Sequence, residues 1–538
     1  MTMRPTTGSA PAPSRSRVFA KWLAASVLAF LAAAPAARAD VRLPALFGHN
    51  MALQQNMPVP IWGTAEPGEK VTVSFAGETA GAEADAQGRW KAVLPALRAG
   101  AAPGDLTVAG RNTIILTNVV AGEVWLCSGQ SNMASKGAYV ADSAVEIAAA
   151  DYPSIRLFTV SLRNNTNSPA EIAGAWTTCT PRSMTYFSAV GYFFGRELHR
   201  ALQVPVGLIN SSRGGTLAEG WTRLARLEAD PELRVVVENH EKRKSDVEGD
   251  KRKFDEAIVK WEQRAKDRKP GLPVPSRPTW VDPADAPGRP GNLWSTMIEP
   301  LIPFAIRGVA WYQGESNASR PDRYARLFPA LIADWRAQWG QGDLPFLFVQ
   351  LPRLHPRAAQ PSDHVWARLR EAQFKTLNTV TNTGMAVTID LGREDVEPQI
   401  HPTEKKEVGE RLAAWALHDV YGKKEVVPSG PLFDRMLVES NCVRIAFTQL
   451  GGGLTNKAPA GIRGFALAGE DRRFAWADAR IDGDTVVVSS TNVPRPVAVR
   501  YGWAGNPETS LFNRGGLPAS PFRSDDWPLA LPERKTTP

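Results

Sequence analysis

The sequence predicts an α/β protein with a mostly parallel sheet, and a β-rich module on either side of the α/β domain. In the middle of the chain, short apolar runs alternate with segments of helical periodicity, the order that produces parallel strands joined by helices. Towards both ends, short strands follow one another with turns between them, which is typical of β-sandwiches. Glycine and proline, 44 and 43 of 538 residues, favour turns and loops over helical bundles.

The chain is expected to begin with a cleaved secretory signal peptide, residues 1–39. Basic residues precede an apolar run of 13 residues, Trp22 to Ala34. This run is too short to span a bilayer, which takes about 20 residues. The small-x-small pattern of Ala37-Arg38-Ala39 is typical of a cleavage site. We therefore expect a periplasmic or secreted protein with no membrane attachment after cleavage.

The signal peptide also explains most of the positive charge. It contains five of the 63 Lys and Arg residues and no acidic residue, so the remainder has 58 basic against 55 acidic side chains. A net charge of +3 instead of +8 removes the main support for a nucleic-acid partner. The chain has no P-loop, no HExxH motif and no EF-hand loop, so we expect no cofactor and no metal.

Residues 40–120 are predicted to form an N-terminal β-sandwich. Val71–Phe75 alternates between apolar and polar residues with a period of two, and Lys91–Pro95 and Arg111–Thr117 are further short strands. The three cysteines of the chain lie beyond this module, at Cys127, Cys179 and Cys442. One disulfide is compatible with an oxidising compartment, and its pairing stays open.

Residues 121–425 are predicted to form the α/β domain. Its buried strands are expected at Val124–Leu126, Val206–Ile209, Gly308–Tyr312, Phe346–Leu351 and Met385–Asp390. Its helices are expected at Tyr186–Ala201, Arg323–Trp339, Val365–Thr376 and Glu404–Tyr421. Because such strands run in parallel, the loops that follow them meet at one edge of the sheet.

A charged insertion interrupts this domain at about residues 226–290. Glu228–Lys269 is dense in charge and is expected to be helical, and a proline-rich loop follows it. Acidic and basic residues are interspersed, which favours a solvated helical hairpin over a site for polyanions. Residues 426–538 form the C-terminal β-rich module, with strands expected at Cys442–Phe447, Gly464–Leu467, Asp484–Ser489 and Ala498–Tyr501.

A candidate nucleophile lies in the turn Gly129–Met133. A glycine turns the chain after a buried strand, and Ser131 follows just before an expected helix. This geometry exposes the hydroxyl at the sheet edge and directs backbone N–H groups to where an oxyanion would form. Met133 stands where the G-x-S-x-G motif of α/β-hydrolases has its last glycine, so that motif is not matched.

A nucleophilic serine needs a base, and His401 is the candidate among seven histidines. It follows the last predicted strand of the sheet and precedes the last helix of the α/β domain. Four acidic residues lie within eleven positions before it: Asp390, Glu394, Asp395 and Glu397. An acidic neighbour suits a base whose ring needs orientation.

Two further loops follow buried strands and contain potential hydrogen-bond donors. Ser211–Thr216 contains Gly214 and Gly215, whose backbone N–H groups are candidate donors. Trp311–Asn317 contains the side-chain amides of Gln313 and Asn317. All these loops are expected at the same sheet edge as Ser131.

These motifs together resemble the sialate O-acetylesterase family, carbohydrate esterases of the SGNH type. The resemblance rests on Val124–Met133, Gly214–Thr216, Trp311–Asn317 and Ile400–Pro402, in this order, and covers nearly the whole mature chain. It implies an SGNH-hydrolase-like, three-layer esterase domain between the two β-modules. The implied activity is hydrolysis of acetyl esters on sugars through an acetylated Ser131.

The resemblance also implies a role for each residue at the site. Ser131 would be the nucleophile and His401 the base. The oxyanion hole would comprise the N–H groups of Ser131 and of Gly214 or Gly215, with the amide of Gln313 or Asn317.

The sequence departs from the family where an aspartate usually stands two or three residues before the histidine. Pro398 and Gln399 occupy these positions. The orienting acid is then Glu397, Asp395 or another group, or a Ser–His dyad works without one, and we favour Glu397. Substrate contacts are expected from Arg213, Gln130 and Glu315, with Arg213 suited to a carboxylate such as that of sialic acid.

The substrate class is left with alternatives. The family name suggests sialic acid, whereas related esterases act on acetylated plant polysaccharides such as xylan or xyloglucan. A carbohydrate-binding protein with an inactive site and a two-carboxylate glycoside hydrolase also remain open. The 17 tryptophans are compatible with sugar binding but belong mostly to a core or to domain interfaces.

Overall fold

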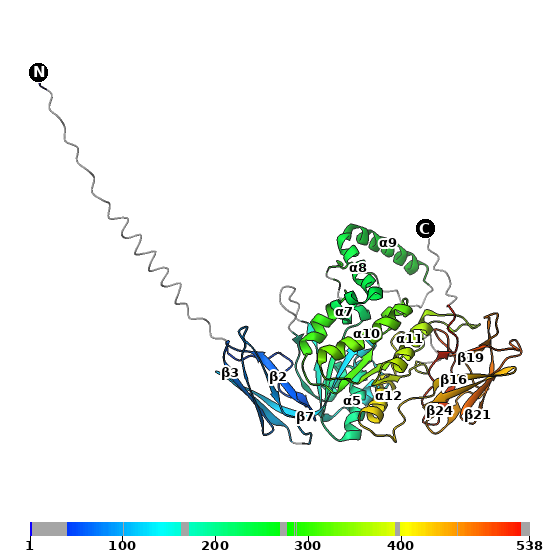
Figure 1. Cartoon of the computed structure of the whole chain (residues 1–538), viewed down its shortest axis with the longest axis horizontal. Helices are drawn as coiled ribbons and strands as arrows, with labels where there is room; N and C mark the ends of the chain where they lie inside the picture. Colours follow the sequence, from blue (N-terminus) through cyan, green and yellow to red (C-terminus); the bar gives the residue numbers. More distant parts are fainter. Residues whose placement is uncertain are drawn as a thin grey trace.

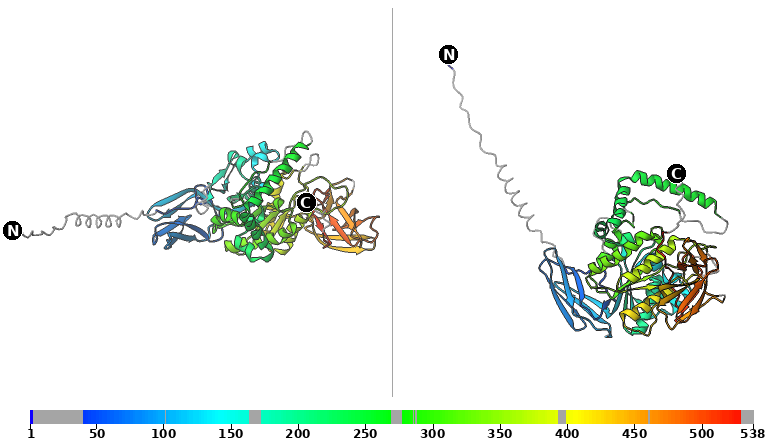
Figure 2. Two further views of the ribbon diagram at one scale, coloured as in Figure 1. Left: turned by 90° about the horizontal axis from the view of Figure 1, so that it is seen from above. Right: turned by 45° about the vertical axis from the view of Figure 1, so that its right-hand side comes forward.

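The computed structural model describes residues 1–2, 40–100, 102–162, 172–268, 277–284, 286, 288–392, 399–459 and 461–528. The predicted signal peptide lies outside this range except for its first two residues, and so does Glu397. An α/β body lies in the middle of the molecule, between the N-terminal and C-terminal β-modules (Figures 1 and 2). Within the described ranges, no helix has the length and hydrophobicity needed to cross a membrane.

A seven-strand path forms the centre of the α/β body. Its order is β11-β8-β12-β7-β13-β14-β15, and every neighbouring pair is parallel except β11 with β8. The strands are β7 (Thr113–Gly129), β8 (Tyr152–Thr159), β11 (Thr177–Cys179), β12 (Val206–Ser212), β13 (Gly308–Tyr312), β14 (Phe346–Val349) and β15 (Thr383–Ala386). The chain leaves β7 to build one side of the sheet and then returns to build the other. The carboxyl end of β7 is therefore the switch point at which such sheets form their sites.

Helices cover both faces of this sheet, which gives the three layers predicted from the sequence (Figure 1). On one face α5 (Ala189–Leu202) packs against α12 (Lys405–Trp415), and on the other α10 (Pro321–Trp339) packs against α11 (Val365–Thr379). Gly409 lets α12 approach α5 closely, because a Cβ at this position would lie 2.6 Å from the Cβ of Phe193.

The N-terminal module is continuous with the α/β body. It comprises β1 (Ala52–Gln54), β2 (Val59–Thr64), β3 (Lys70–Phe75), β4 (Glu78–Glu83), β5 (Arg89–Leu94), β6 (Gly104–Ala109) and the first part of β7. The 17-residue strand β7 pairs first with β6, then with β1, and finally with β12 and β13. The domain boundary predicted at residue 120 therefore falls inside one continuous strand.

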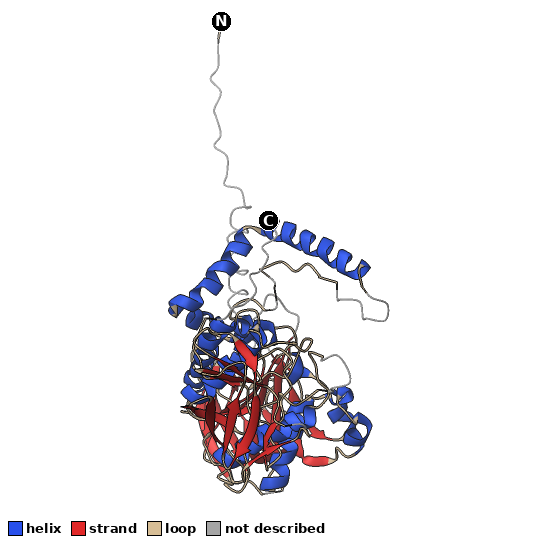
Figure 3. Cartoon of the chain, turned by 90° about the vertical axis from the view of Figure 1, so that its right-hand side faces the viewer, coloured by secondary structure: helices blue, strands red, loops and turns tan. Residues whose placement is uncertain are grey.

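The charged insertion projects from the body as two helices, α8 (Pro231–Ser245) and α9 (Val247–Lys266) (Figures 1 and 3). An ion pair between Arg243 of α8 and Asp250 of α9, at 2.8 Å, connects them. This agrees with a solvated helical hairpin.

The C-terminal module has a core of its own around Val443, Leu467, Val486 and Tyr501. Its strands are β16 (Leu432–Glu439), β17 (Cys442–Thr448), β18 (Leu454–Asn456), β19 (Phe465–Ala468), β20 (Phe474–Trp476), β21 (Asp478–Asp482), β22 (Thr485–Ser489), β23 (Ala498–Tyr501), β24 (Leu511–Asn513) and β25 (Phe522–Arg523).

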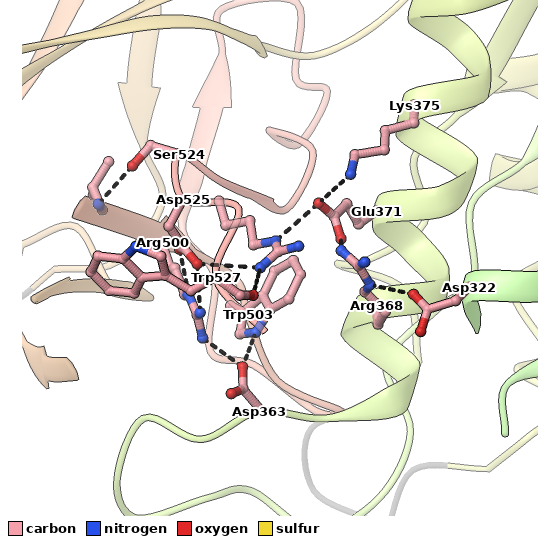
Figure 4. A network of polar contacts seen from close by, with 12 residues as sticks. Asp322, Asp363, Arg368, Glu371, Lys375, Arg500, Trp503, Ser524, Asp525 and Trp527 are labelled. Carbon is pink, nitrogen blue, oxygen red and sulfur yellow. Dashed lines mark hydrogen bonds and ion pairs between the residues drawn. The ribbon is translucent and has the colours of Figure 1, made fainter. Parts of the chain in front are cut away.

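Buried arginines attach this module to the α/β body. Arg370 of α11 is fully buried and donates to the carbonyl oxygens of Leu351 and Pro352 on its own side and of Ala504 and Gly505 in the module. Arg523 of the module pairs with Glu371 of α11, and Arg500 pairs with Asp363 (Figure 4). Because these charges are buried on both sides, they fix the orientation of the module.

The three cysteines are free thiols, so the disulfide left open by the sequence is not formed. Cys127 and Cys179 are buried, and burial raises the pKa of each thiol to about 12. Neither is therefore a reactive thiolate at neutral pH.

Candidate active site

Ser131 and His401 form a hydrogen-bonded pair at the carboxyl edge of the sheet. Ser131 opens the short helix α2 (Ser131–Ala134) directly after β7, and His401 lies between β15 and α12. His401 Nε2 is 2.8 Å from Ser131 Oγ, although 270 positions separate them in the sequence. This is the geometry of a nucleophile beside its general base.

Gly129 determines where the serine emerges. Its φ of 131° lies in a region that favours glycine, and a Cβ there would lie 2.1 Å from the carbonyl oxygen of Tyr312 in β13. The end of β7 therefore packs against β13 without a side chain between them, and the chain turns at once into α2. As a result, Ser131 is presented at the sheet edge.

Gly214 lies against the nucleophile, as the sequence predicts for an oxyanion donor. A Cβ at this position would lie 3.3 Å from the Cβ of Ser131, so a side chain would crowd the serine. The backbone N–H of Arg213 donates to the carbonyl oxygen of Gly129 at 3.0 Å, which connects the loop after β12 to the end of β7. The exposed Gly214 therefore stays beside Ser131, and the role of Gly214 or Gly215 as a donor remains a prediction.

The side-chain amides of Gln313 and Asn317 are buried and used within the protein. Asn317 Oδ1 accepts from the backbone N–H of Ala218 at 3.0 Å, which fixes the orientation of this amide, and Asn317 Nδ2 donates to Glu219 at 2.8 Å. Gln313 Nε2 donates to the carbonyl oxygen of Thr216 at 3.1 Å and to Asn317 Oδ1 at 2.7 Å. Gln313 thus donates both of its amide hydrogens within the protein, whereas Asn317 retains one, so of the two alternatives expected for the oxyanion hole Asn317 is the one that still has a hydrogen to donate.

Gln130 and Glu315, expected to contact substrate, face the interior instead. Gln130 Oε1 accepts from the backbone N–H groups of Gly314 and Ser316, at 3.4 and 3.3 Å. Glu315 is buried and accepts a hydrogen bond of 2.5 Å from Asn132. Both side chains hold the loops together. Arg213 is half-buried and, among the residues described, has no carboxylate within ion-pair distance.

Two residues that the sequence analysis did not single out, Asn132 and Lys405, hold the backbone on both sides of His401. Asn132 Nδ2 donates to the carbonyl oxygen of Ile400 at 2.9 Å. Lys405 Nζ donates to the carbonyl oxygen of Pro402 at 2.5 Å and to Asn132 Oδ1 at 2.6 Å. We call Asn132 and Lys405 the histidine clamp, because together they fix the peptide segment that carries the base.

The histidine clamp contains a buried positive charge. Burial lowers the pKa of Lys405 to about 8, although Glu315 and Glu404 partly oppose this effect. Burial also raises the pKa of Glu315, against the hydrogen bond from Asn132. The pKa of His401 lies below its usual 6.5, first because of burial and then because of the positive charge of Lys405. The imidazole therefore stays neutral, in the form that accepts a proton from serine.

Both clamp residues stand close to the predicted pair in the sequence. Asn132 is adjacent to Ser131, and Lys405 follows His401 by four positions at the start of α12. The acidic candidate Asp390 is already used, since Arg411 binds both of its oxygens at 2.6 and 2.7 Å. Glu394, Asp395 and the favoured Glu397 lie outside the described residues.

Comparison with known proteins agrees with this geometry. A family model described as "Carbohydrate esterase, sialic acid-specific acetylesterase" matches residues 121–248 and 289–418, which contain Ser131, Gly214 and His401. The sialate O-acetylesterase of Rattus norvegicus is 33% identical over 408 residues, 69% of this chain and 72% of that protein. That of Mus musculus is 30% identical over 513 residues, 86% of this chain and 90% of that protein. The chain belongs to this carbohydrate esterase family.

A solved structure extends the likeness to the β-modules. The crystal structure of a carbohydrate acetylesterase from Xanthomonas citri is 37% identical, with a TM-score of 0.74 over 90% of this chain and 100% of that one. This confirms the SGNH-type α/β fold class inferred from the sequence motifs. The family model stops at residue 248 and resumes at 289, so its gap covers α9 and the segment that follows, within the charged insertion predicted at about 226–290.

Replacing Lys405 tests the histidine clamp. We expect Lys405→Met to lower kcat/KM by about tenfold or more, because small displacements of a catalytic group are costly. The acidic limb of the pH profile should lie below pH 6.5 in the original protein, since His401 must be neutral, and should move to higher pH in the variant, which lacks the opposing positive charge. The measurement is kcat/KM for 4-nitrophenyl acetate as a function of pH.

The neighbouring Lys406 provides the matched control for this experiment. It is partly exposed and pairs with Glu146 at 2.8 Å, so Lys406→Met should leave the acidic limb in place. An acidic limb that does not move in Lys405→Met would contradict the assignment of Lys405 to His401.

Proposed function

We propose that the protein hydrolyses acetyl esters on sugars through an acetylated Ser131. The observation that carries this proposal is the 2.8 Å contact between His401 Nε2 and Ser131 Oγ beside Gly214. The names of the related esterases support the acetyl ester as the reacting group and a carbohydrate as its carrier.

The proposed reaction has two halves. His401 accepts the hydroxyl proton while Ser131 Oγ attacks the acetyl carbonyl, and the backbone N–H groups of Ser131 and Gly214 stabilise the oxyanion. The carbonyl–oxygen bond to the sugar then breaks, and the sugar alkoxide takes its proton from His401. In the second half, water transfers a proton to His401 and attacks the acetylated serine, which releases acetate and restores the enzyme.

Ser131→Ala tests the nucleophile. We expect acetate release to fall by about a thousandfold or more, because the serine forms the covalent intermediate. Acetate is measured with acetylated sialosides, acetylated xylan and acetylated xyloglucan as substrates, and Ser245→Ala at the exposed end of α8 is the control. A serine-directed organophosphate should label the original protein at residue 131. Shortened sugar chains, or an absence of labelling, would support a glycoside hydrolase or a binding protein instead.

We propose that Glu397 orients the His401 ring through Nδ1. This is supported by its position four residues before the histidine and by the engagement of Asp390 with Arg411. Glu397→Gln should lower kcat by about tenfold or more, since an orienting acid stabilises the imidazolium. Asp395→Asn should have little effect. An unchanged rate for Glu397→Gln would leave a Ser–His dyad supported by the histidine clamp alone.

We propose that sialate esters are the preferred substrates, with Arg213 binding the sialic acid carboxylate. The loop that places Gly214 beside Ser131 also contains Arg213. Arg213→Ala should lower the ratio of kcat/KM on an acetylated sialoside to kcat/KM on acetylated xylan by about tenfold, the effect of one charge-assisted contact. An unchanged ratio would instead favour the alternative of a plant polysaccharide.

We also propose that the protein is exported to the periplasm or beyond the cell. The basic residues, short apolar run and small-x-small site at residues 1–39 support cleavage before Asp40.

A further inference from the structure

We propose that the junction of the C-terminal module with the α/β body contains a second glycan-binding site, which takes a carboxylate-bearing sugar of the same glycan chain. This inference rests on the proposed function. A cavity of about 460 Å³ opens between residues 361–363, just before α11, and the strands β20 and β23. Aromatic and charged side chains line it together: Asp363, Arg472, Phe474, Trp476, Arg500 and Trp503.

Trp476 provides a fixed aromatic wall. Its side chain is 42% exposed, yet its indole Nε1 donates to the carbonyl oxygen of Ala359 at 3.0 Å. It also borders a second hollow, of about 390 Å³, so cavities lie next to it on more than one side. An exposed indole that is already held in place stacks on a sugar ring at little conformational cost. Most tryptophans of this chain are buried instead, as the sequence analysis expects.

The floor of the cavity is rigid and its charges are paired. The guanidinium of Arg500 lies 3.9 Å from the ring centroid of Phe474 and 5.2 Å from that of Trp503. It binds Asp363 at 2.6 Å and Asp525 at 2.8 Å, and Trp503 Nε1 also donates to Asp363 (Figure 4). The floor therefore presents a fixed surface to a ligand, and its charged groups are already paired within the protein.

Arg472 adds a cation that has no ion pair among the described residues. It is exposed, its guanidinium stacks at 5.3 Å on the ring of Trp527, and no carboxylate among the described residues lies within ion-pair distance. An arginine guanidinium beside an aromatic wall suits a ligand that combines a sugar ring with a carboxylate, through paired charge-assisted hydrogen bonds. This combination indicates an acidic sugar.

The cavity lies along the same sheet edge as the catalytic pair. The segment that leads to residues 361–363 leaves the carboxyl end of β14, which neighbours β13 in the sheet. Arg353 of this segment donates to the carbonyl oxygen of Gly392, in the segment that leads from β15 to His401. The loop that borders the cavity is therefore connected to the segment that carries His401, and the proposal requires a glycan long enough to reach from one to the other.

The test measures binding without turnover, in a background that combines Ser131→Ala with Arg213→Ala, so that the arginine beside the active site does not contribute to the binding of acidic probes. The probes are sialyllactose and a xylotetraose that carries glucuronic acid, and lactose and plain xylotetraose are their neutral counterparts. Titration calorimetry should give saturable binding of at least one acidic probe, and which one binds distinguishes a sialic acid from a uronic acid. We expect Trp476→Ala to weaken this binding by about tenfold and Arg472→Ala to reduce it to that of the neutral counterpart.

Matched variants keep the result interpretable. Trp476→Phe retains an aromatic face and should retain most of the binding, whereas Arg480→Ala removes an exposed arginine of β21 outside the cavity and should change nothing. Unfolding midpoints check that each variant is folded. The inference is overturned if neither acidic probe binds, or if Trp476→Ala and Arg472→Ala bind as tightly as their parent.

This outcome is separable from failure of the proposed function. Acetate release by the protein with Ser131 intact reports on the esterase activity, whereas the titration needs no reaction. Acetate release without acidic-probe binding overturns only the second site. Probe binding that depends on Trp476 and Arg472, in a protein that releases no acetate, supports the site and contradicts the esterase.

Discussion

The contact between Ser131 and His401 depends on a lysine that is buried at a cost. Lys405 is almost completely removed from solvent, and burial moves its pKa down to about 8. A charge in such a place persists only where hydrogen bonds compensate it, and here Lys405 Nζ donates to the carbonyl oxygen of Pro402 and to Asn132 Oδ1. Asn132 in turn holds the carbonyl oxygen before His401. Lys405 thereby helps to position His401, and its charge adds to burial in lowering the pKa of the imidazole.

The central sheet was predictable because its strands are buried on both faces. β12, β13 and β14 stand out as continuous apolar runs, and the structure places them within three residues of the predicted limits. The predicted strand limits are wrong where the apolar run in the sequence is longer than the segment that pairs with a neighbouring strand. The run expected at Met385–Asp390 pairs only as far as Ala386. The sequence pattern changes after residue 120 because β7 changes its pairing partner there, and the strand itself continues without interruption.

The site was predictable to the extent that topology determines it. Loops after parallel strands meet at one edge, so Ser131, Gly214 and His401 follow from strand order and residue type. The hydrogen bonds that each side chain makes do not follow from strand order, because they depend on which partners lie nearby after folding. Gln313 Nε2 donates to the carbonyl oxygen of Thr216 and to Asn317 Oδ1, and nothing in the sequence indicates this. Lys405 appears in the sequence as an ordinary basic residue at a helix start, and only the packing around it reveals its role.

The unbroken course of β7 has a consequence for how this protein can be divided. Its first residues belong to the ladder of the N-terminal module, and its last residue is Gly129, two positions before the nucleophile. Cutting the chain at residue 120 would leave a frayed edge whose register is no longer held from one end. The N-terminal module therefore holds β7 in the position that presents Ser131 at the sheet edge. To exchange such modules between esterases, the two chains have to be joined within β7 without changing the register of this strand.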